Sequence, residues 1–390
     1  MVNNVYMTLD PVTTTLRPDM NTMTLVHRAS RGTLAWWRSV VLYEYSAEAA
    51  THAEAAIDCV ADVTRLGADG VVIPSGAQPI SSADAAAIVS AHHEAGLKVV
   101  PSLSPSRGKD GLLEDAQTWL AAGADGIDLR SALAVDHDLA TGPFHALLAE
   151  HLDDGLLSGA MRERDDVADH LAEDWLGHIR DDSLTDAPWD ADEIRDSITR
   201  TFATRDALGA SPAWTTTYAL YRRGPSGTSW QANDHSPNRV RATALMVMAL
   251  PGACYLLQGE EVGLRDWSLD QAPAERAQRV RAAQLEQEFD PTSMFEHYRR
   301  SLHLRRGHRL GTGTVAWIDG AHRADGTLEL LNRCLLTVLN TSSRPVALPE
   351  AVNLVHASTD IRRLSDGRLV LPSDAAAMIE LPPFAGSEEV

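Results

Sequence analysis

Cysteine is scarce in this chain. Only Cys59, Cys254 and Cys334 occur among 390 residues, far apart and without C-x-x-C spacing. A disulfide framework or a typical structural zinc site needs closely spaced cysteines, so we expect reduced, buried thiols. The sequence also has no glycine-rich phosphate loop and no metal-ligand cluster. We therefore expect neither a metal nor a cofactor.

Basic residues are outnumbered as well. Lys and Arg total 34 against 54 Asp and Glu, for a formal net charge of −20. This excess of negative charge disfavours nucleic acid and anionic membranes as partners. The partner we expect is a small molecule or a protein that the sequence does not identify. No apolar run is long enough to span a bilayer, and residues 1–32 lack the basic start and apolar core of a signal peptide. We expect a cytoplasmic protein.

The chain is long enough for one large and one small domain, and 44% of its residues are hydrophobic. After an N-terminal extension over residues 1–35, short apolar segments alternate with alanine-rich segments of helical length. The predicted strands are residues 40–43, 71–73, 98–100, 127–129, 156–161, 177–184, 213–217 and 253–258. Continuously apolar strands separated by helices indicate a covered parallel sheet. Eight such units predict an α/β fold, a (β/α)8 TIM barrel over residues 36–306.

Helices are expected between these strands, and a different pattern follows them. The predicted helices are residues 47–66, 82–95, 112–122, 191–202 and 238–250, with Asp190 capping the fourth. From about residue 310 the pattern changes to strands at 328–331 and 335–340, separated from short extended segments by proline and glycine. This predicts a small C-terminal all-β sandwich domain over residues 310–385.

Several motifs resemble glycoside hydrolase family 13, the α-amylase/α-glucosidase superfamily. Trp36-Trp37-Arg38 with Tyr43 resembles the family's W-W-R-x-x-x-x-Y, and residues 66–70 resemble L-G-V-D-x. Residues 249–263 resemble A-L-P-G-x-x-x-x-Y-Q-G-E-E-x-G, and residues 298–306 resemble the helix before the family's C-terminal domain. The resemblance covers nearly everything after residue 35 and implies the barrel and β-domain described above.

The catalytic residues of that family are absent at the matching positions. Residues 123–133 (G-A-D-G-I-D-L-R-S-A-L) resemble the nucleophile strand G-x-D-G-F-R-x-D-x-x-x-x-L. Asp128 replaces the family's arginine, Arg130 its nucleophilic aspartate, and Ala160 the general acid glutamate. Leu220 replaces the third carboxylate. An arginine cannot attack an anomeric carbon, so the resemblance implies a degenerate member.

Two further departures point the same way. The family's first motif falls on Ser102, Ser106 and Arg107, and only residues 104–111 connect the third strand to its helix, where the family inserts a domain. Retaining glycosidases need two carboxyl groups about 5–5.5 Å apart. We therefore expect no glycoside hydrolysis.

Three functions remain open at this point. The first is a non-hydrolytic family 13-like protein that binds a ligand or a protein partner. The second is an enzyme with non-glycosidic chemistry at a repurposed barrel mouth, built from Asp128, Arg130, Glu260 and His235. The third is an α-glucosidase-like hydrolase whose motifs lie in another register, in which Asn233-Asp234-His235 would supply the third carboxylate.

Eight side chains are candidates for the barrel mouth. They are Tyr43, Arg107, Asp128, Arg130, Tyr218, His235, Glu260 and Glu261. Asp128 and Arg130 are expected on one face of one strand, and Arg130 should pair with a carboxylate, Asp128 or Glu260, because an unpaired buried charge is costly. Arg107 either binds an anion or pairs with Asp110. Tyr43 is core or a ligand platform, and the two glutamates support the barrel top.

Overall fold

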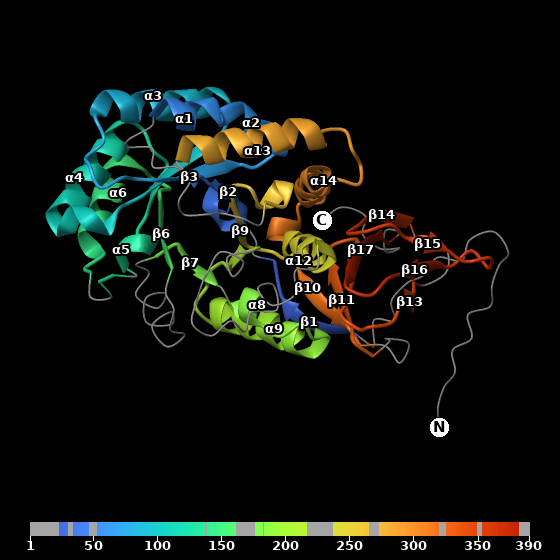
Figure 1. Ribbon diagram of the computed structural model, residues 1–390. Coiled ribbons are helices and arrows are strands. Elements are labelled where there is room, and N and C mark those ends of the chain that lie inside the picture. The colour runs from blue at the N-terminus through green and yellow to red at the C-terminus, as the bar shows by residue number, and fades with distance from the viewer. Residues whose placement is uncertain are drawn as a thin grey trace.

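The computed structural model describes residues 23–29, 34–46, 53–133, 135–136, 139–160, 176–181, 183–216, 237–264, 273–319, 325–348 and 353–381. Eight parallel strands close into a barrel in chain order (Figure 1). These strands are β2 (Val41–Glu44), β3 (Gly70–Pro74), β4 (Lys98–Ser102), β5 (Gly126–Asp128), β6 (Leu156–Ala160), β7 (His178–Asp181), β8 (Ala213–Thr215) and β9 (Ala253–Leu257). All eight strands expected from the sequence are present, and the predicted (β/α)8 fold is confirmed.

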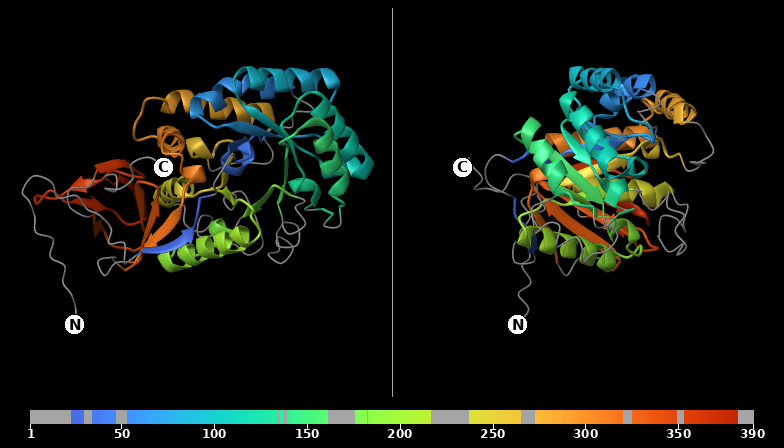
Figure 2. Two further views of the ribbon diagram at one scale, coloured as in Figure 1. Left: turned by 180° about the vertical axis from the view of Figure 1, so that it is seen from behind. Right: turned by 90° about the vertical axis from the view of Figure 1, so that its left-hand side faces the viewer.

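Helices cover the outside of the barrel (Figures 1 and 2). They are α1 (Ala53–Asp58), α2 (Val60–Leu66), α3 (Ser82–Glu94), α4 (Gly108–Ala121), α5 (Arg130–Leu133), α6 (Gly142–His151), α8 (Ser183–Asp186), α9 (Ala191–Ala207), α12 (Pro237–Ala249), α13 (Pro273–Gln287) and α14 (Met294–Gly307). Short 3-10 turns are η2 (Trp36–Ser39), η3 (Pro105–Arg107), η4 (Glu260–Val262) and η5 (Leu310–Thr312). The cap predicted for α9 is confirmed, since Asp190 accepts hydrogen bonds from the amides of Asp192 and Glu193.

Two apolar layers hold the barrel together. Side chains on the outer strand faces, such as Tyr43, Val71 and Val99, pack against the helices in one large core. Side chains on the inner faces, such as Leu42 and Val72, fill the lumen together with Tyr255. The period-two alternation of a strand separates the two sets.

The C-terminal part is all-β, as expected. A six-stranded antiparallel sheet contains β10 (Val315–Ile318), β11 (Thr327–Asn332), β12 (Leu335–Asn340), β14 (Asn353–Ala357) and β17 (Ala375–Glu380), and a smaller sheet contains β13 (Val346–Ala347), β15 (Arg362–Arg363) and β16 (Leu369–Leu371). A second apolar core lies between the two sheets. The opposite face of the larger sheet joins the core of the barrel domain, beside α12 (Figure 2).

The N-terminal segment departs from the expected extension. Residues 23–27 form β1 (Met23–His27), the sixth strand of the larger C-terminal sheet, and pair antiparallel with β10 in a register that includes Met23 opposite Ile318. The sequence predicts residues 1–35 as an extension outside the folded domains, because a single edge strand carries little local signal. The first and last strands of the described residues, β1 and β17, therefore lie in the same sheet.

Candidate functional site at the barrel mouth

Three charged side chains point into the lumen from the carboxyl ends of the strands, where barrel enzymes place their active sites. Glu44 ends β2, Asp128 ends β5, and Arg180 lies on β7. All three are buried, at 7%, 0% and 3% relative exposure. Charges at such depth are stable only when they are paired.

Arg180 is the centre of this group. Its Nη1 lies 2.6 Å from Glu44 Oε2, its Nη2 lies 3.5 Å from Asp128 Oδ2, and its guanidinium stacks 3.9 Å above the centre of the Tyr255 ring. Burial by itself lowers the pKa of Arg180, but the charges of Glu44 and Asp128 more than offset it and raise that pKa. The guanidinium is therefore a fixed positive charge between two carboxylates.

Arg130 joins the group through Glu44. It donates a hydrogen bond from Nη2 to Glu44 Oε1, and its side chain is only 14% exposed. Burial alone would raise the pKa of Glu44, but the charges of Arg130 and Arg180 outweigh it and hold that pKa below its usual value. Glu44 is thus an ionised carboxylate held by two guanidinium groups.

Arg130 pairs with a carboxylate, as predicted, but the partner is Glu44 and neither Asp128 nor Glu260. Asp128 and Arg130 do not alternate along one strand, because β5 ends at Asp128 and Arg130 begins the short helix α5. The carboxylate that Arg130 meets is Glu44, on the first barrel strand. Asp128 instead accepts a hydrogen bond from Ser158 Oγ at 2.8 Å and faces Arg180.

Tyr43 and Glu261 lie outside the lumen. Leu42 and Glu44 point inward, so Tyr43 between them faces the helices, and its hydroxyl donates to Glu261 Oε1 at 2.7 Å. Of the two predictions for Tyr43, core residue or ligand platform, the core position is the one observed. Glu261 in η4 also accepts hydrogen bonds from Gln284 Nε2 and the Gly259 amide. Burial raises the pKa of Glu261, and these donors only partly oppose the increase.

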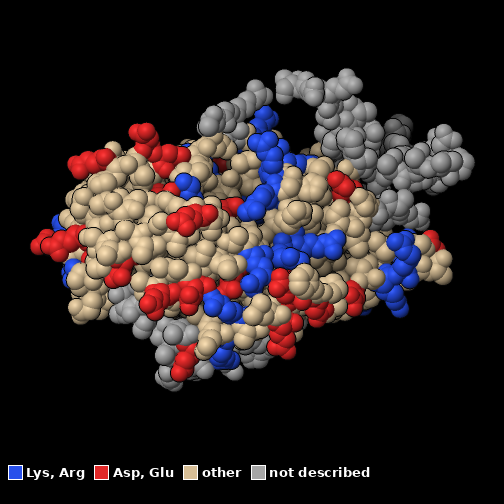
Figure 3. All heavy atoms as spheres, turned by 90° about the horizontal axis from the view of Figure 1, so that it is seen from above, with Lys and Arg blue, Asp and Glu red and all other residues tan. Residues whose placement is uncertain are grey.

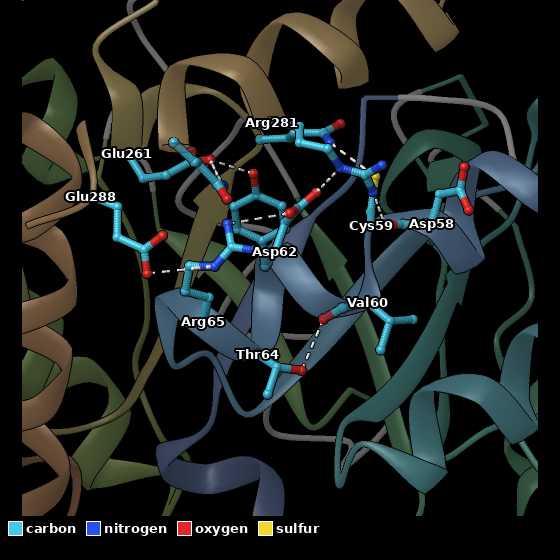
Figure 4. A network of polar contacts seen from close by, with 12 residues as sticks. Asp58, Cys59, Val60, Asp62, Thr64, Arg65, Glu261, Arg281 and Glu288 are labelled. Atoms are coloured by element: carbon cyan, nitrogen blue, oxygen red, sulfur yellow. Dashed lines mark hydrogen bonds and ion pairs between the residues drawn. The ribbon is translucent and has the colours of Figure 1, made fainter. Parts of the chain in front are cut away.

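Figure 4 shows the polar network of this outer layer beside Glu261. Arg281 of α13 reaches Asp62 of α2 with Nε 2.8 Å from Oδ2, and it also donates to the Asp58 carbonyl. Arg65 lies 3.6 Å from Asp62 and 3.8 Å from Glu288. These contacts attach helix α13 to helix α2 and position no group toward the lumen.

Two of the remaining candidates, Glu260 and Arg107, have other partners. Glu260 in η4 accepts hydrogen bonds from the Thr216 hydroxyl and the Leu257 amide. Arg107 pairs with Asp115, Nε to Oδ2 at 3.0 Å, and lies 3.6 Å from Glu114. The expected partner Asp110 is therefore wrong: Asp115, eight residues on, lies two helical turns along α4 and faces back toward Arg107. Ala160 lies on β6 in register with Arg180, whereas Tyr218, Leu220 and His235 lie outside the described residues.

Structural comparison identifies amylase-type neighbours, while no family model and no curated protein matches the sequence. A debranching enzyme from Nostoc punctiforme superimposes with a TM-score of 0.60 at 12% identity, over 92% of this chain and 100% of that chain. A protein from Thermus thermophilus gives 0.60 at 13% identity, over 89% and 100%. A cyclomaltodextrinase gives 0.60 at 14% identity, over 89% and 79%. At these identities the similarity shows the fold alone, a (β/α)8 barrel followed by an all-β domain.

The lumen of the barrel is also filled below the charged group. His178 Nδ1 lies 2.9 Å from the Tyr255 hydroxyl, and the Trp37 ring meets His178 edge-on at 5.4 Å. Burial lowers the pKa of His178 to about 3, and the charge of Arg180 acts in the same direction, so this imidazole is neutral. Trp36 and Trp37 pack against the lumen cluster from the amino ends of the strands.

Glu44, His178, Arg180 and Tyr255 were all missed by sequence reasoning. Glu44, His178 and Arg180 lie outside the family motifs, and Tyr255 stands at an unspecified position of the motif over residues 249–263. The alternation of Leu42 with Glu44 and of His178 with Arg180 is nevertheless a usable signal. In a barrel strand the residue two places after an inward side chain also points inward.

A cavity lies at the opposite end of the barrel, beside the amino ends of the strands. It has a volume of about 700 Å³ and is lined by Trp36, Lys98 and Arg306 among other residues. Two of its cations have acidic partners: Lys98 Nζ lies 2.6 Å from Asp125, and Arg306 Nη2 lies 2.7 Å from Asp69. Barrel enzymes use the other face, so this cavity is not a candidate active site.

No helix among the described residues is long and apolar enough to cross a membrane. On the face that looks upward in Figure 1, acidic side chains are prominent over one half and basic side chains gather toward the middle (Figure 3).

Proposed function

We propose that this protein is a non-hydrolytic member of the α-amylase superfamily that binds a ligand or a protein partner. The observation that carries the proposal is the buried group formed by Glu44, Arg180, Asp128 and Arg130 in the lumen. It lies at the carboxyl ends of the strands, where an amylase-type barrel would bind a sugar.

The chemistry of this group does not suit a retaining glycosidase. Such an enzyme needs one carboxylate free to attack and one carboxylic acid whose raised pKa lets it protonate the leaving group. Glu44 is held ionised by two guanidinium groups, and Asp128 faces Arg180 and Ser158. Both carboxylates therefore have structural partners in place of a substrate.

The proposal is tested by hydrolysis of maltose, sucrose and an aryl α-glucoside with the purified full chain. We expect no turnover above the rate of a blank, and no change in Asp128→Asn. Turnover that is lost in Asp128→Asn or Asp234→Asn would overturn the proposal and favour a hydrolase with another motif register. Turnover that persists in both variants would identify a contaminating enzyme.

Ligand binding is tested separately by thermal shift with sugars and acidic metabolites. Binding of a sugar without turnover is the outcome expected for a non-hydrolytic ligand-binding protein. Chemical conversion of a non-sugar compound, abolished by Arg180→Met, would favour the alternative of a repurposed barrel mouth.

A further inference from the structure

Three residues with metal-binding side chains meet beside the last helix of the barrel domain. His308 follows the carboxyl end of α14, Cys334 lies in the hairpin between β11 and β12, and Glu380 ends β17. One ligand atom from each lies within 4.8 Å of the other two, and all three residues are half-buried. Imidazole nitrogen, thiolate sulfur and carboxylate oxygen are the three ligand types that proteins offer to zinc.

The spacing within this cluster suits a tetrahedral ion. Cys334 Sγ lies 3.5 Å from His308 Nδ1. With Zn–S near 2.3 Å and Zn–N near 2.0–2.1 Å, tetrahedral angles place a sulfur and a nitrogen ligand about 3.5 Å apart. The two atoms can thus bind one ion without rearrangement.

The backbone fixes the three positions before any ion binds. Leu335 lies opposite Glu380 in the β12–β17 ladder, and the Leu381 amide donates to the Cys334 carbonyl at 2.8 Å. Arg333, which precedes Cys334, has a φ of 55° and donates to the carbonyls of Arg309 and Thr312. The hairpin is therefore tied to the segment that follows His308.

Glu380 also has a positioning partner. Asn353 Nδ2 donates to Glu380 Oε2 at 2.8 Å, from the strand that pairs with β17 on its other side. A hydrogen bond to one oxygen of a carboxylate orients the other, as in metal sites whose ligands are held by an outer shell of polar groups.

We propose that His308, Cys334 and Glu380 bind a zinc-like divalent transition-metal ion, with a fourth position open to water or an exogenous ligand. The ion would link the end of α14 to the C-terminal sheet. Binding replaces the S–H bond of Cys334 by an S–metal bond, and the proton goes to solvent. The sequence alone predicts no metal site, because the three ligands are separated by 26 and 46 residues and match no ligand-spacing motif.

Proton release follows from the state of the thiol. The thiolate, not the thiol, is the form of cysteine that binds a metal ion, so binding displaces the thiol proton. Zinc titrations in buffers of different ionisation enthalpy should therefore report proton release.

The test uses the full chain from which bound metal has been removed with a chelator. This metal-free protein is titrated with Zn²⁺ to measure affinity and with Co²⁺ to record the absorption spectrum of the bound ion. We expect one high-affinity ion per chain and a thiolate-to-cobalt charge-transfer band. Cys334→Ser should abolish the band, and Glu380→Gln should weaken zinc binding at least tenfold. Asn353→Ala should weaken it by roughly 10–100-fold, as removal of an outer-shell partner does.

The control is His303→Ala, an exposed histidine on the same helix, which should bind zinc as the wild type does. The absence of a cobalt–thiolate band in the wild type would overturn the proposal. The contact between Cys334 and His308 would then be a hydrogen bond only. Equal zinc affinity in the wild type and in Glu380→Gln would also overturn it. Glu380→Gln changes neither size nor shape, so the test does not depend on the folding of the cysteine variant.

Discussion

The lumen of the barrel and the layer between the barrel and its helices stabilise a buried carboxylate in opposite ways. In the lumen, Glu44 is bound by two arginines and its pKa is lowered. In the outer layer, Glu261 is surrounded by the neutral donors Tyr43, Gln284 and the Gly259 amide, and its pKa is raised. The difference shows that the lumen stabilises its carboxylate by charge pairing, whereas the outer layer holds Glu261 by hydrogen bonds from neutral groups.

Arg180→Met should have the largest effect. It removes the cation between Glu44 and Asp128 and leaves a buried charge uncompensated, which costs about 3–5 kcal/mol of unfolding free energy. Urea unfolding measures this loss. The matched control is Arg306→Ala, whose exposed ion pair with Asp69 should contribute no more than about 1 kcal/mol. Equal losses in the two variants would contradict the charge-pairing account.

Arg130→Ala should have an intermediate effect, because Glu44 keeps its contact with Arg180. Loss of a hydrogen bond to a charged group suggests a decrease of roughly 1.5–3 kcal/mol in unfolding free energy. The variant should gain no activity on an aryl α-glucoside. Hydrolysis by Arg130→Ala would mean that this arginine blocks an intact active site.

Tyr43→Phe tests the outer layer. The change removes one of the donors to Glu261 and leaves the ring packing, so we expect a loss of about 1–1.5 kcal/mol. Chemical denaturation of the two proteins in parallel gives the value. A loss as large as that of Arg180→Met would show that Glu261 depends on Tyr43 as strongly as the lumen depends on its ion pairs.

The pH dependence of stability should have opposite signs in the two regions. The stability from Glu44 is present above the unfolded pKa of about 4.3 and is lost as pH falls through its lower folded pKa. The contribution of Glu261 is present below the unfolded pKa and is lost as pH rises toward its higher folded pKa. On acidification from pH 7, Glu261→Gln should therefore lose stability more steeply than the wild type.

Glu44→Gln should show the reverse, a shallower acid loss than the wild type below about pH 4.3. Thermal unfolding at a series of pH values measures both slopes, with each variant compared to its own value at pH 7. If stability fell with pH at the same rate in Glu44→Gln and Glu261→Gln, the two carboxyl groups would not differ in the way described.

The fold could be predicted in detail because its signal is local. The sequence predicted eight short apolar strands and five of the helical segments between them, but not α6, and it correctly placed Asp190 as the cap of α9. Strand β1 could not be predicted in the same way. Its pairing joins residues 23–27 to residues 315–318, and nothing in five residues of local sequence indicates a partner so distant.

The site was predicted less well because it depends on closure of the barrel. The sequence indicated that Arg130 needs a carboxylate, but only the closed barrel brings Glu44 across the lumen to meet it. Asp128 was expected as its partner from a spacing of two residues, which fails where β5 gives way to α5. Arg180 was overlooked because it lies on the strand with the weakest sequence signal.

The most direct test of the account is a double-mutant cycle between Glu44 and Arg180. Unfolding free energies of the wild type, Glu44→Gln, Arg180→Met and the double variant give the coupling between the two side chains. The account predicts a coupling of at least about 1.5 kcal/mol, as measured for close charge pairs, with the double variant more stable than the sum of the single losses implies. Additive losses, within about 0.5 kcal/mol, would show that the lumen is not held by this ion pair and would contradict the account.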